Sequence, residues 1–335
     1  MNITIVCKGG VNTGLGHLHR TISFIEGAGN YAGFKLIAII DKGLEVLFKN
    51  MPGTTFIYEE SGLPEALSGK EFETTCCIID STDLNPDNQR LLRNKYGKII
   101  SLSPVFNNYG IIDVLFTRFG EYDYPSHIKV FGGLEYTIFN SNCLQIPDNV
   151  YAQNLSEKAL TVGISMGGVD APNKTLSILR SLAKLEQEYT FWVLLGEGYS
   201  HSYQDIVDAI SKDSNHEIVL AKSNRSMWKI LSNCSLAVFA GGLTSFEAIY
   251  AGLPAINIFE KEIHRSIISR EITEKNVSVN LGMLNDQTLE ALKEQLTFLY
   301  SNRTRLSEMR MNAKGLVDKS GPERTIKKIL ELIGD

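Results

Sequence analysis

The segment TGLGHLHR, residues 13–20, contains the side chains whose types and spacing best suit chemistry. It lies between an apolar run, residues 3–7, that predicts a strand and a pattern that predicts a helix from His17 to about residue 27. Arg20 follows His17 by three residues and therefore shares its face of the helix. A histidine at the positive end of a helix, beside a guanidinium, stays neutral near pH 7 because both disfavour the imidazolium. His17 is therefore the candidate general base.

Gly14 and Gly16 in this segment would let the backbone turn tightly and let a ligand approach closely. The alternative is an ordinary glycine turn followed by two surface histidines, and the segment alone does not decide between them. The segment does not satisfy G-x-G-x-x-G, and the chain contains no G-x-x-x-x-G-K-[ST]. Neither a dinucleotide fingerprint nor a P-loop is therefore predicted.

A second glycine cluster, AGGLTSFEAIYAGLP, follows the apolar residues 236–239. Gly241 and Gly242 open a turn, and Thr244 or Ser245 is expected to cap the helix that follows. Free amides, small side chains and the positive end of a helix together form a phosphate-binding site.

Glu247 is placed in the first turn of that helix, where its carboxylate could accept hydrogen bonds from ribose hydroxyls. Its alternative role is to complement the helix dipole.

The loop SMGGVDAPNKT, residues 165–175, offers a further set of amides, and Gly167 and Gly168 could form one wall of a diphosphate site. That loop could equally be a tight strand-to-helix turn without a ligand.

The chain has the pattern of two similar halves, each beginning with a strand, a glycine loop and a helix. We expect an N-terminal domain over residues 1–145, a C-terminal domain over residues 158–335, and a linker over about residues 140–157. The final helix, about residues 323–333, carries an apolar stripe and must dock on other elements. Strand-like runs alternate with helical ones, which predicts doubly wound parallel sheets of the α/β class. These runs cover residues 3–7, 36–40, 77–79, 98–101, 160–164, 191–195, 236–240 and 255–259.

Composition narrows the functions that are possible. The chain of 335 residues is 43% hydrophobic and 21% charged, as is usual for a folded protein, and its net charge of −5 argues against a nucleic-acid surface. The five cysteines are scattered without a C-x-x-C pair, so they are expected to be reduced and mostly buried. We also expect no metal, no cofactor, no transmembrane segment and a cytoplasmic location.

Three segments together, TGLGHLHR, SMGGVDAPNKT and AGGLTSFEAIYAGLP, resemble the UDP-sugar hydrolases of pseudaminic acid biosynthesis and the related spore-coat polysaccharide proteins. The stretch GGLEYTIF, residues 132–139, is similar to one near the interdomain linker of that family. The resemblance implies a GT-B architecture, in which two Rossmann-like domains face each other across a cleft. It also implies that the C-terminal domain holds UDP with Glu247 at the ribose, and that His17 activates water for attack at the anomeric carbon.

The chain departs from this family at two places on the sugar side of the site. Family hydrolases tend to have a tyrosine shortly after an Asp that ends a central strand, whereas here Asp80 is followed by Ser81 and Thr82. They also tend to have an Asn-Gln pair where this chain has Ile263 and His264. Asp80, Thr82 and His264 are therefore candidates for the sugar side, although a histidine at a helix start is more often a capping or surface residue.

The expected chemistry is substitution at the anomeric carbon of a UDP-linked sugar, with His17 accepting a proton from the attacking hydroxyl. Amides around Gly167, Gly168, Gly242 and Thr244 would stabilise the leaving diphosphate, with Arg20 as a possible cation. Attack by water makes a hydrolase, which we favour narrowly; attack by a sugar or lipid-linked acceptor makes a glycosyltransferase. A nucleotide-sugar binding protein without catalysis ranks last, because His17 is present.

Overall fold

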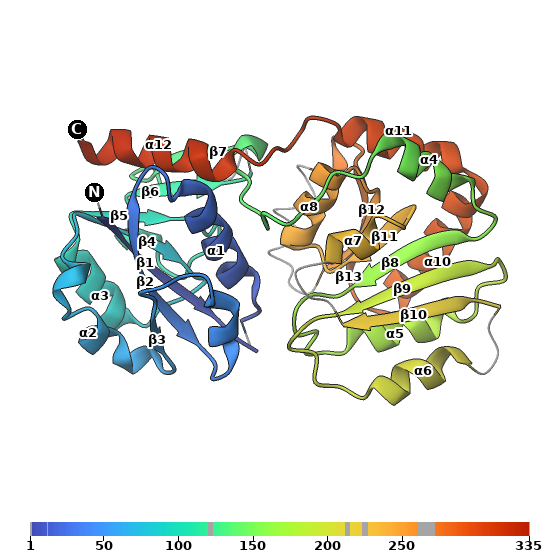
Figure 1. The fold of residues 1–335 in the computed structure, drawn as a ribbon, viewed down its shortest axis with the longest axis horizontal. Helices are drawn as coiled ribbons and strands as arrows, with labels where there is room; N and C mark the ends of the chain where they lie inside the picture. The colour runs from blue at the N-terminus through green and yellow to red at the C-terminus, as the bar shows by residue number, and fades with distance from the viewer. Residues whose placement is uncertain are drawn as a thin grey trace. The chain divides into compact units, whose positions relative to one another are not determined.

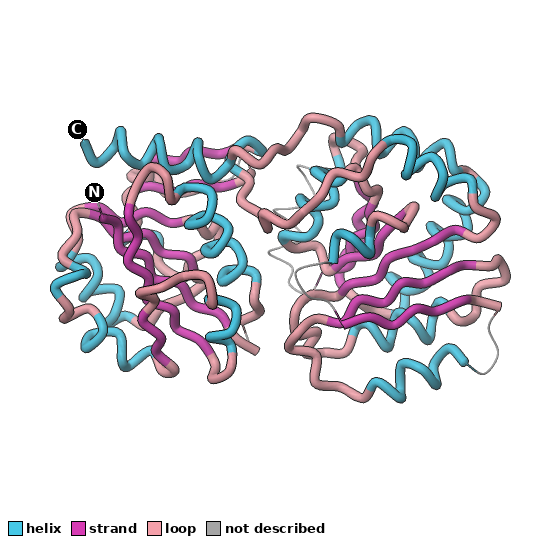
Figure 2. Tube along the Cα trace, viewed as in Figure 1, coloured by secondary structure: helices cyan, strands magenta, loops and turns pink. Residues whose placement is uncertain are grey.

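The chain forms two separate α/β units in the computed structural model, which describes residues 2–11, 13–119, 123–211, 215–222, 227–259 and 272–334. Unit 1 comprises Met1–Ser141 and Asp318–Asp335, and unit 2 comprises Asn142–Val317. Strands and helices alternate along each unit (Figures 1 and 2). Because residues of both termini belong to unit 1, the chain passes twice between the units.

Unit 1 is built on a seven-stranded sheet in which every pairing is parallel. Its strands are β1 (Asn2–Gly9), β2 (Gly33–Ile40), β3 (Thr55–Ile57), β4 (Cys76–Asp80), β5 (Lys98–Ser101), β6 (Val114–Thr117) and β7 (Lys129–Gly132). The order in space is β3-β2-β1-β4-β5-β6-β7. The central strands read as almost continuous apolar runs because a parallel sheet is buried on both faces.

Helices cover both faces of this sheet. They are α1 (Gly16–Ala28), α2 (Leu63–Ala66), α3 (Pro86–Lys95) and α12 (Gly321–Gly334), with short 3-10 helices η1 (Leu44–Phe48), η2 (Glu60–Gly62), η3 (Lys70–Phe72), η4 (Tyr109–Ile111) and η5 (Leu134–Tyr136). α1 and α12 pack together on one face, and α2 and α3 lie on the other (Figure 1). The first turn of α1 therefore lies at the carboxyl end of β1.

Unit 2 repeats this plan with a six-stranded sheet, again parallel throughout. The strands are β8 (Leu160–Ser165), β9 (Tyr189–Leu195), β10 (Glu217–Lys222), β11 (Leu236–Phe239), β12 (Ala255–Phe259) and β13 (Ser278–Met283), in the order β10-β9-β8-β11-β12-β13. The helices are α4 (Asp148–Ser156), α5 (Lys174–Leu182), α6 (Tyr203–Ser211), α7 (Met227–Leu231), α8 (Leu243–Ala251), α10 (Asp286–Ser301) and α11 (Arg303–Ala313). α5, α6 and α10 cover one face, and α4, α7 and α8 cover the other (Figure 1).

The structure corrects two expectations about domain boundaries. The final helix, α12, packs on α1 and belongs to unit 1, not to the C-terminal domain expected over residues 158–335. Gly27 permits this packing because a Cβ atom there would lie 2.7 Å from the ring of Pro322. The expected linker over residues 140–157 is also wrong in extent, because α4 forms within it as part of unit 2.

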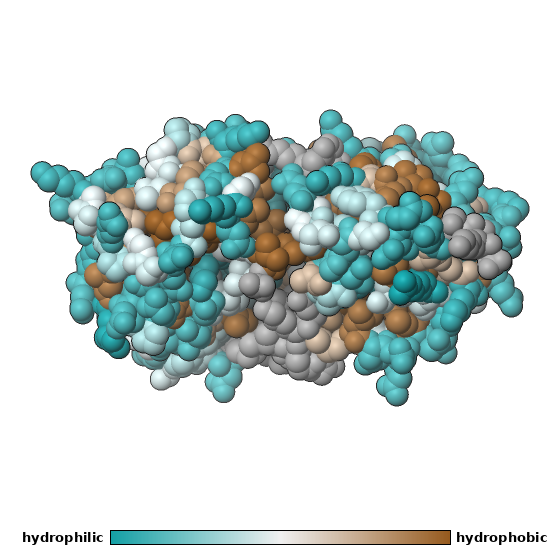
Figure 3. All heavy atoms as spheres, turned by 90° about the horizontal axis from the view of Figure 1, so that it is seen from below, coloured by the Kyte–Doolittle hydropathy of each residue, from teal (hydrophilic) through white to brown (hydrophobic). Residues whose placement is uncertain are grey.

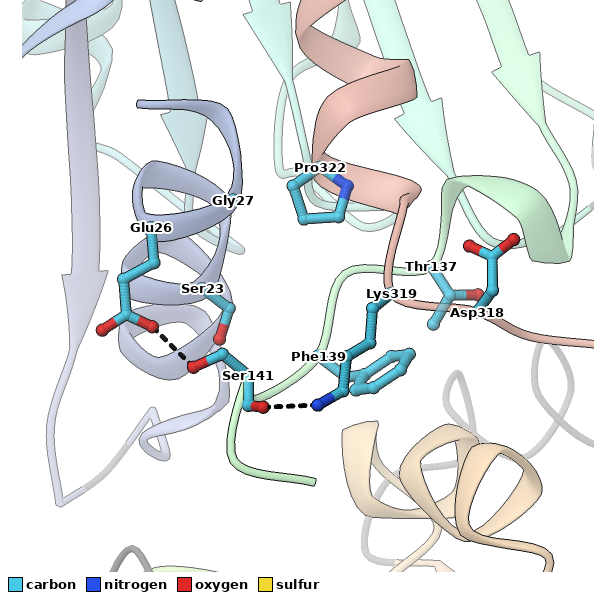
Figure 4. A pocket seen from close by; sticks show the side chains of 9 residues that line it. All are labelled: Ser23, Glu26, Gly27, Thr137, Phe139, Ser141, Asp318, Lys319 and Pro322. Atoms are coloured by element: carbon cyan, nitrogen blue, oxygen red, sulfur yellow. Dashed lines mark hydrogen bonds between the residues drawn. The ribbon is translucent and has the colours of Figure 1, made fainter. Parts of the chain in front are cut away.

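A cavity of about 200 Å³ lies inside unit 1, where α1, the segment after η5 and the start of α12 meet (Figure 4). At its edge, Ser141 Oγ donates to Glu26 (2.8 Å), and Lys319 Nζ donates to the carbonyl oxygen of Ser141 (2.8 Å). One of these hydrogen bonds lies where the chain leaves unit 1, and the other lies where the chain returns to it. Together they connect both segments to helix α1.

The surface is largely hydrophilic on the face drawn in Figure 3, with apolar side chains scattered among polar ones. All five cysteines are buried thiols outside any disulfide, as expected. Within the described ranges, no helix combines the length and apolarity that crossing a bilayer would require.

Candidate functional site

The strand order reverses between β1 and β4 in unit 1, and ligands of open parallel sheets bind at the carboxyl end of such a switch point. His17 lies in the first turn of α1, directly after β1, and Asp80 is the last residue of β4. Strand pairing sets Asp80 beside Cys7, near the end of β1. The topology thus brings a histidine and a carboxylate to the same edge of the sheet.

The two side chains are in contact. Nδ1 of His17 lies 2.7 Å from Oδ1 of Asp80, whose side chain is fully buried, while that of His17 is 14% exposed. A carboxylate on one ring nitrogen leaves the other nitrogen, Nε2, directed elsewhere. This is the arrangement of an oriented general base.

Asp80 is itself held by two further side chains of α1. Arg20 donates from Nε to Oδ2 (2.9 Å) and from Nη2 to Oδ1, and Thr21 donates from Oγ1 to Oδ2 (3.1 Å). Residues 17, 20 and 21 share one face of the helix, because they are three and four positions apart. One turn of α1 therefore supplies every one of these contacts to Asp80.

The proton position on His17 follows from this network. Arg20 Nη2 also lies 2.9 Å from Nδ1 of His17, and both atoms approach Oδ1 of Asp80. A guanidinium always donates, so Nδ1 cannot accept from Arg20 and also donate to Asp80. Since an ionised Asp80 is an acceptor only, we assign the proton to Nδ1, which leaves the lone pair on Nε2.

Burial lowers the pKa of His17 below its ordinary value of 6.5, and it is the largest effect. The hydrogen bond and negative charge of Asp80 oppose the shift, whereas the positive charges of Arg20 and Arg118 add to it. Burial alone would raise the pKa of Asp80, but Arg20 and His17 hold that pKa well below its usual range. His17 is thus neutral and Asp80 ionised near pH 7, as a base and its partner must be.

Two sequence assignments are corrected here. Asp80, expected on the sugar side, is buried behind His17 and bound on both oxygens by protein donors. Arg20, expected as a cation for the diphosphate, is buried and bonded to Asp80 instead. Both residues therefore position His17. Thr82 lies two residues beyond Asp80 and is half-buried, with its hydroxyl 3.3 Å from Oδ1 of Asp83.

Gly14 and Gly16 border open space beside this group. A Cβ atom at either position would meet no atom within 4 Å, and Gly14 has a φ of 82°. Leu15, the residue before α1, makes no side-chain cap. The positive end of α1 therefore lies next to His17.

Unit 2 has its own switch point between β8 and β11, and α8 begins just after β11. Gly242 is the residue before the helix and makes no side-chain cap. Gly241 has a φ of 68°, and a Cβ atom there would lie 2.3 Å from the ring of Phe259. We call residues 241–244 the amide turn, since their backbone forms the positive end of α8.

Two expectations about α8 are corrected. The helix begins at Leu243, so neither Thr244 nor Ser245 caps it; Ser245 is buried and donates to Asn257 Oδ1 (2.7 Å). Glu247 lies beyond the first turn and is only 5% exposed. Its Oε2 accepts a hydrogen bond from Trp228 Nε1 (3.1 Å).

In the loop after β8, a carboxylate of the protein itself binds the amides that were expected to bind phosphate. Asp170 accepts hydrogen bonds from the backbone N–H groups of Lys174 (2.8 Å) and Thr175 (2.9 Å), which are the first amides of α5. The carbonyl oxygen of Gly168 accepts from Gly198 N (2.9 Å), whereas a Cβ atom on Gly167 would meet open space. The start of α5 is therefore not a free phosphate seat, and the amide turn of α8 is the stronger candidate.

Further residues of these sites were not found from sequence. Thr21 could have been found from its spacing of four from His17, and Asn257 from being the polar residue in the apolar run AINIF. Arg118, directly after β6, has its pKa lowered to about 9 by burial and by the charge of Arg20.

His264 lies outside the described residues. In the part of the chain that is described, no group of three or more His, Cys, Asp or Glu side chains could hold a metal ion.

The fold of the whole chain matches solved structures that share little sequence with it. MurG of Acinetobacter baumannii superposes with a TM-score of 0.70 at 14% identity, covering 99% of this chain and 100% of that one. The UDP-GlcNAc 2-epimerase of Neisseria meningitidis, solved with UDP-GlcNAc, gives 0.63 at 11% identity over 99% and 100%. UGT2 of Phytolacca americana, solved with UDP-2fluoro-glucose and pterostilbene, gives 0.63 at 11% over 100% of both chains. The chain has the GT-B fold.

Comparison of the amino-acid sequence with known proteins is less informative than comparison of the fold. No protein-family model matches the chain. An uncharacterized protein of Methanocaldococcus jannaschii is 22% identical over 277 residues, which cover 79% of this chain and 57% of that relative. The chain thus spans less than two thirds of the length of this relative. The more specific resemblance to pseudaminic acid hydrolases and spore-coat proteins stays a prediction, as does a cleft between the two units.

Proposed function

We propose that this protein is an enzyme that acts on a UDP-linked sugar, substituting at the anomeric carbon and releasing UDP. The observation that carries the proposal is the contact between His17 and Asp80 at the switch point of unit 1. A neutral imidazole oriented by a buried carboxylate is suited to take a proton from an attacking hydroxyl. The UDP-sugar ligands of two structures with the same fold support the choice of substrate class.

In the proposed reaction, Nε2 of His17 accepts the proton of the attacking hydroxyl as the new bond to the anomeric carbon forms. The bond from that carbon to the diphosphate oxygen breaks, and its electron pair leaves with UDP. Asp80 then stabilises the imidazolium through the hydrogen bond at Nδ1. Such general-base assistance contributes on the order of 10²–10⁴-fold in rate.

We assign the diphosphate to the amide turn of unit 2. Its backbone amides and the positive end of α8 would stabilise the negative charge that grows on the leaving group. Glu247, held by Trp228, stays the proposed partner of the ribose.

Hydrolysis, with water as the attacking group, is the form of the reaction that we propose first. It rests on the resemblance of the TGLGHLHR segment to UDP-sugar hydrolases. Transfer to an acceptor hydroxyl is the second candidate, because Ser81 and Thr82 follow Asp80 at the end of β4, where related hydrolases tend to have a tyrosine.

The deciding experiment incubates the purified protein with a panel of UDP-amino sugars, with and without a sugar or lipid-linked acceptor, and identifies the products by NMR and mass spectrometry. Release of UDP and free sugar without acceptor would establish hydrolysis, and strict dependence on acceptor would establish transfer. Turnover to an epimerised UDP-sugar, or no turnover of any donor, would contradict the proposal.

A further inference from the structure

Asn257 is a polar residue at the centre of the apolar strand β12, in the run AINIF. It is 0% exposed. A buried amide without hydrogen bonds is unfavourable, so its side chain must be satisfied from within the protein. The groups that form hydrogen bonds with the Asn257 side chain show which elements it connects.

Asn257 connects α8 to the neighbouring strand. Its Oδ1 accepts the hydrogen bond from Ser245 Oγ (2.7 Å), and its Nδ2 donates to Asn280 Oδ1 (2.8 Å) and, more weakly, to Ser278 Oγ (3.3 Å) on β13. Asn257 and Asn280 are register partners in the sheet, directly before its register shift. The amide therefore has fixed donors and acceptors on both sides.

The same face of β12 also supports the other end of the amide turn. Side chains two apart on a strand point to the same face, so Phe259 lies on the side of Asn257, while Ile256 and Ile258 join the apolar core on the opposite face. The ring of Phe259 fills the space beside Gly241 where a Cβ atom would otherwise lie. Phe259 thus contacts the beginning of the amide turn, and Asn257 bonds to Ser245 directly after its end.

We infer that Asn257 is a positioning residue for the amide turn: through Ser245 it holds the backbone amides of residues 241–244 in place for a diphosphate. This inference rests on the proposed function, because it assumes that the turn binds the diphosphate of UDP. Donors that stabilise a developing charge must be held in place before the reaction, and an apolar contact alone fixes a helix start less firmly than a buried hydrogen-bond network.

The test compares binding of three probes, UDP, inorganic pyrophosphate and uridine, to the full-length protein and to Asn257→Leu, Ser245→Ala and the double variant. Calorimetry measures the first two probes, and ligand-detected NMR measures uridine. Each single variant should weaken UDP and pyrophosphate about tenfold, the scale of one lost buried hydrogen bond. Uridine, which lacks phosphate, should bind as before. The double variant should bind no more weakly than the worse single variant, because both act through one contact.

Asn154→Ala is the matched control. Asn154 is another asparagine of unit 2, and its Nδ2 donates to the carbonyl oxygens of Ser232 (2.7 Å) and Cys234 (3.4 Å), neither of which belongs to the amide turn. Its variant should lose stability but keep its affinity for all three probes. An equal loss for uridine, additive effects in the double variant, or a loss of pyrophosphate affinity matched by Asn154→Ala would overturn the inference.

Failure of the proposed function would look different. If the unaltered protein bound neither UDP nor pyrophosphate, the assignment of the diphosphate to the amide turn would fall, and this inference with it. If the unaltered protein and every variant bound both ligands equally well, only the role of Asn257 would be rejected.

Discussion

Oδ1 of Asp80 lies 2.7 Å from Nδ1 of His17, although the two residues are 63 positions apart in the chain. The contact joins the end of one central strand to the first turn of the helix that follows its neighbour. It gives His17 a defined proton position and leaves Nε2 as the basic atom. The chemistry proposed for unit 1 depends on this contact.

Replacing His17 with Ala should lower kcat by about 10²–10⁴-fold, because the proton acceptor is lost. UDP affinity, measured by calorimetry, should change little, since the nucleotide is assigned to unit 2. His19→Ala is the control, because His19 lies two positions further along α1 and so on another face of the helix. A comparable loss of UDP binding in His17→Ala would mean that the histidine is structural.

Asp80→Asn should reduce kcat strongly, by about 10²–10⁴-fold, because the imidazolium loses its stabilising charge and the tautomer is no longer enforced. The pKa of His17 should fall further, since the hydrogen bond and charge of Asp80 are the effects that raise it. NMR titration of the His17 ring would measure this directly. An unchanged pKa together with an unchanged rate would remove Asp80 from the mechanism.

The pH dependence of kcat/KM should show an acid limb set by His17. The rate should rise with pH through a pKa below the ordinary 6.5 and then stay level, because the neutral imidazole is the active form. A limb centred above 6.5 would contradict the assignment of His17 as a buried base.

Stability should fall on the acid side for two separate reasons. Asp80 has a folded pKa below its unfolded value of 3.8, so its contribution is present above that value and is lost as the pH falls through the folded pKa. His17 also has a lowered folded pKa, so the unfolded chain takes up its proton first, and stability begins to fall below about pH 6.5. Urea unfolding between pH 7.5 and 3 would show this decline; a free energy of unfolding that increased over this interval would contradict it.

Glu247→Gln should weaken the binding of both UDP and uridine about tenfold while leaving pyrophosphate unaffected, if the carboxylate binds the ribose. A glutamine can still accept the hydrogen bond from Trp228, so the fold around α8 should be preserved. Unchanged affinity for uridine would remove Glu247 from the ribose site.

Gly241→Ala should destabilise the protein by about 1–3 kcal/mol, because the new methyl group meets the buried ring of Phe259 and the backbone has a positive φ. Gly167→Ala is the matched control: its φ is also positive, at 95°, but a Cβ atom there meets open space. Chemical denaturation should therefore show a smaller loss for residue 167. Equal losses would mean that backbone strain, not packing against Phe259, makes Gly241 necessary.

Local patterns in the sequence determined the α/β class, eight of the strands and the position of His17 at a strand-to-helix junction. These features follow from apolar periodicity and glycine placement, which act over a few residues. The strands β3, β7, β10 and β13 were missed because they lie at the edges of the two sheets, where partly exposed positions interrupt the apolar run that marks a buried strand. The neutral state of His17 was also expected, but the main cause is burial rather than the helix end.

Only the tertiary structure decided which polar groups are available to a ligand. In the structure, Arg20 is bonded to Asp80, and Asp170 accepts the hydrogen bonds of the first amides of α5. Glu247 lies beside Trp228, and α12 belongs to unit 1. Apart from the local hydrogen bonds of Asp170, these outcomes depend on contacts between segments that the chain brings together in space. Sequence spacing shows which side chains share a face, but burial and long-range pairing determine whether a charge meets a protein partner or remains open to substrate.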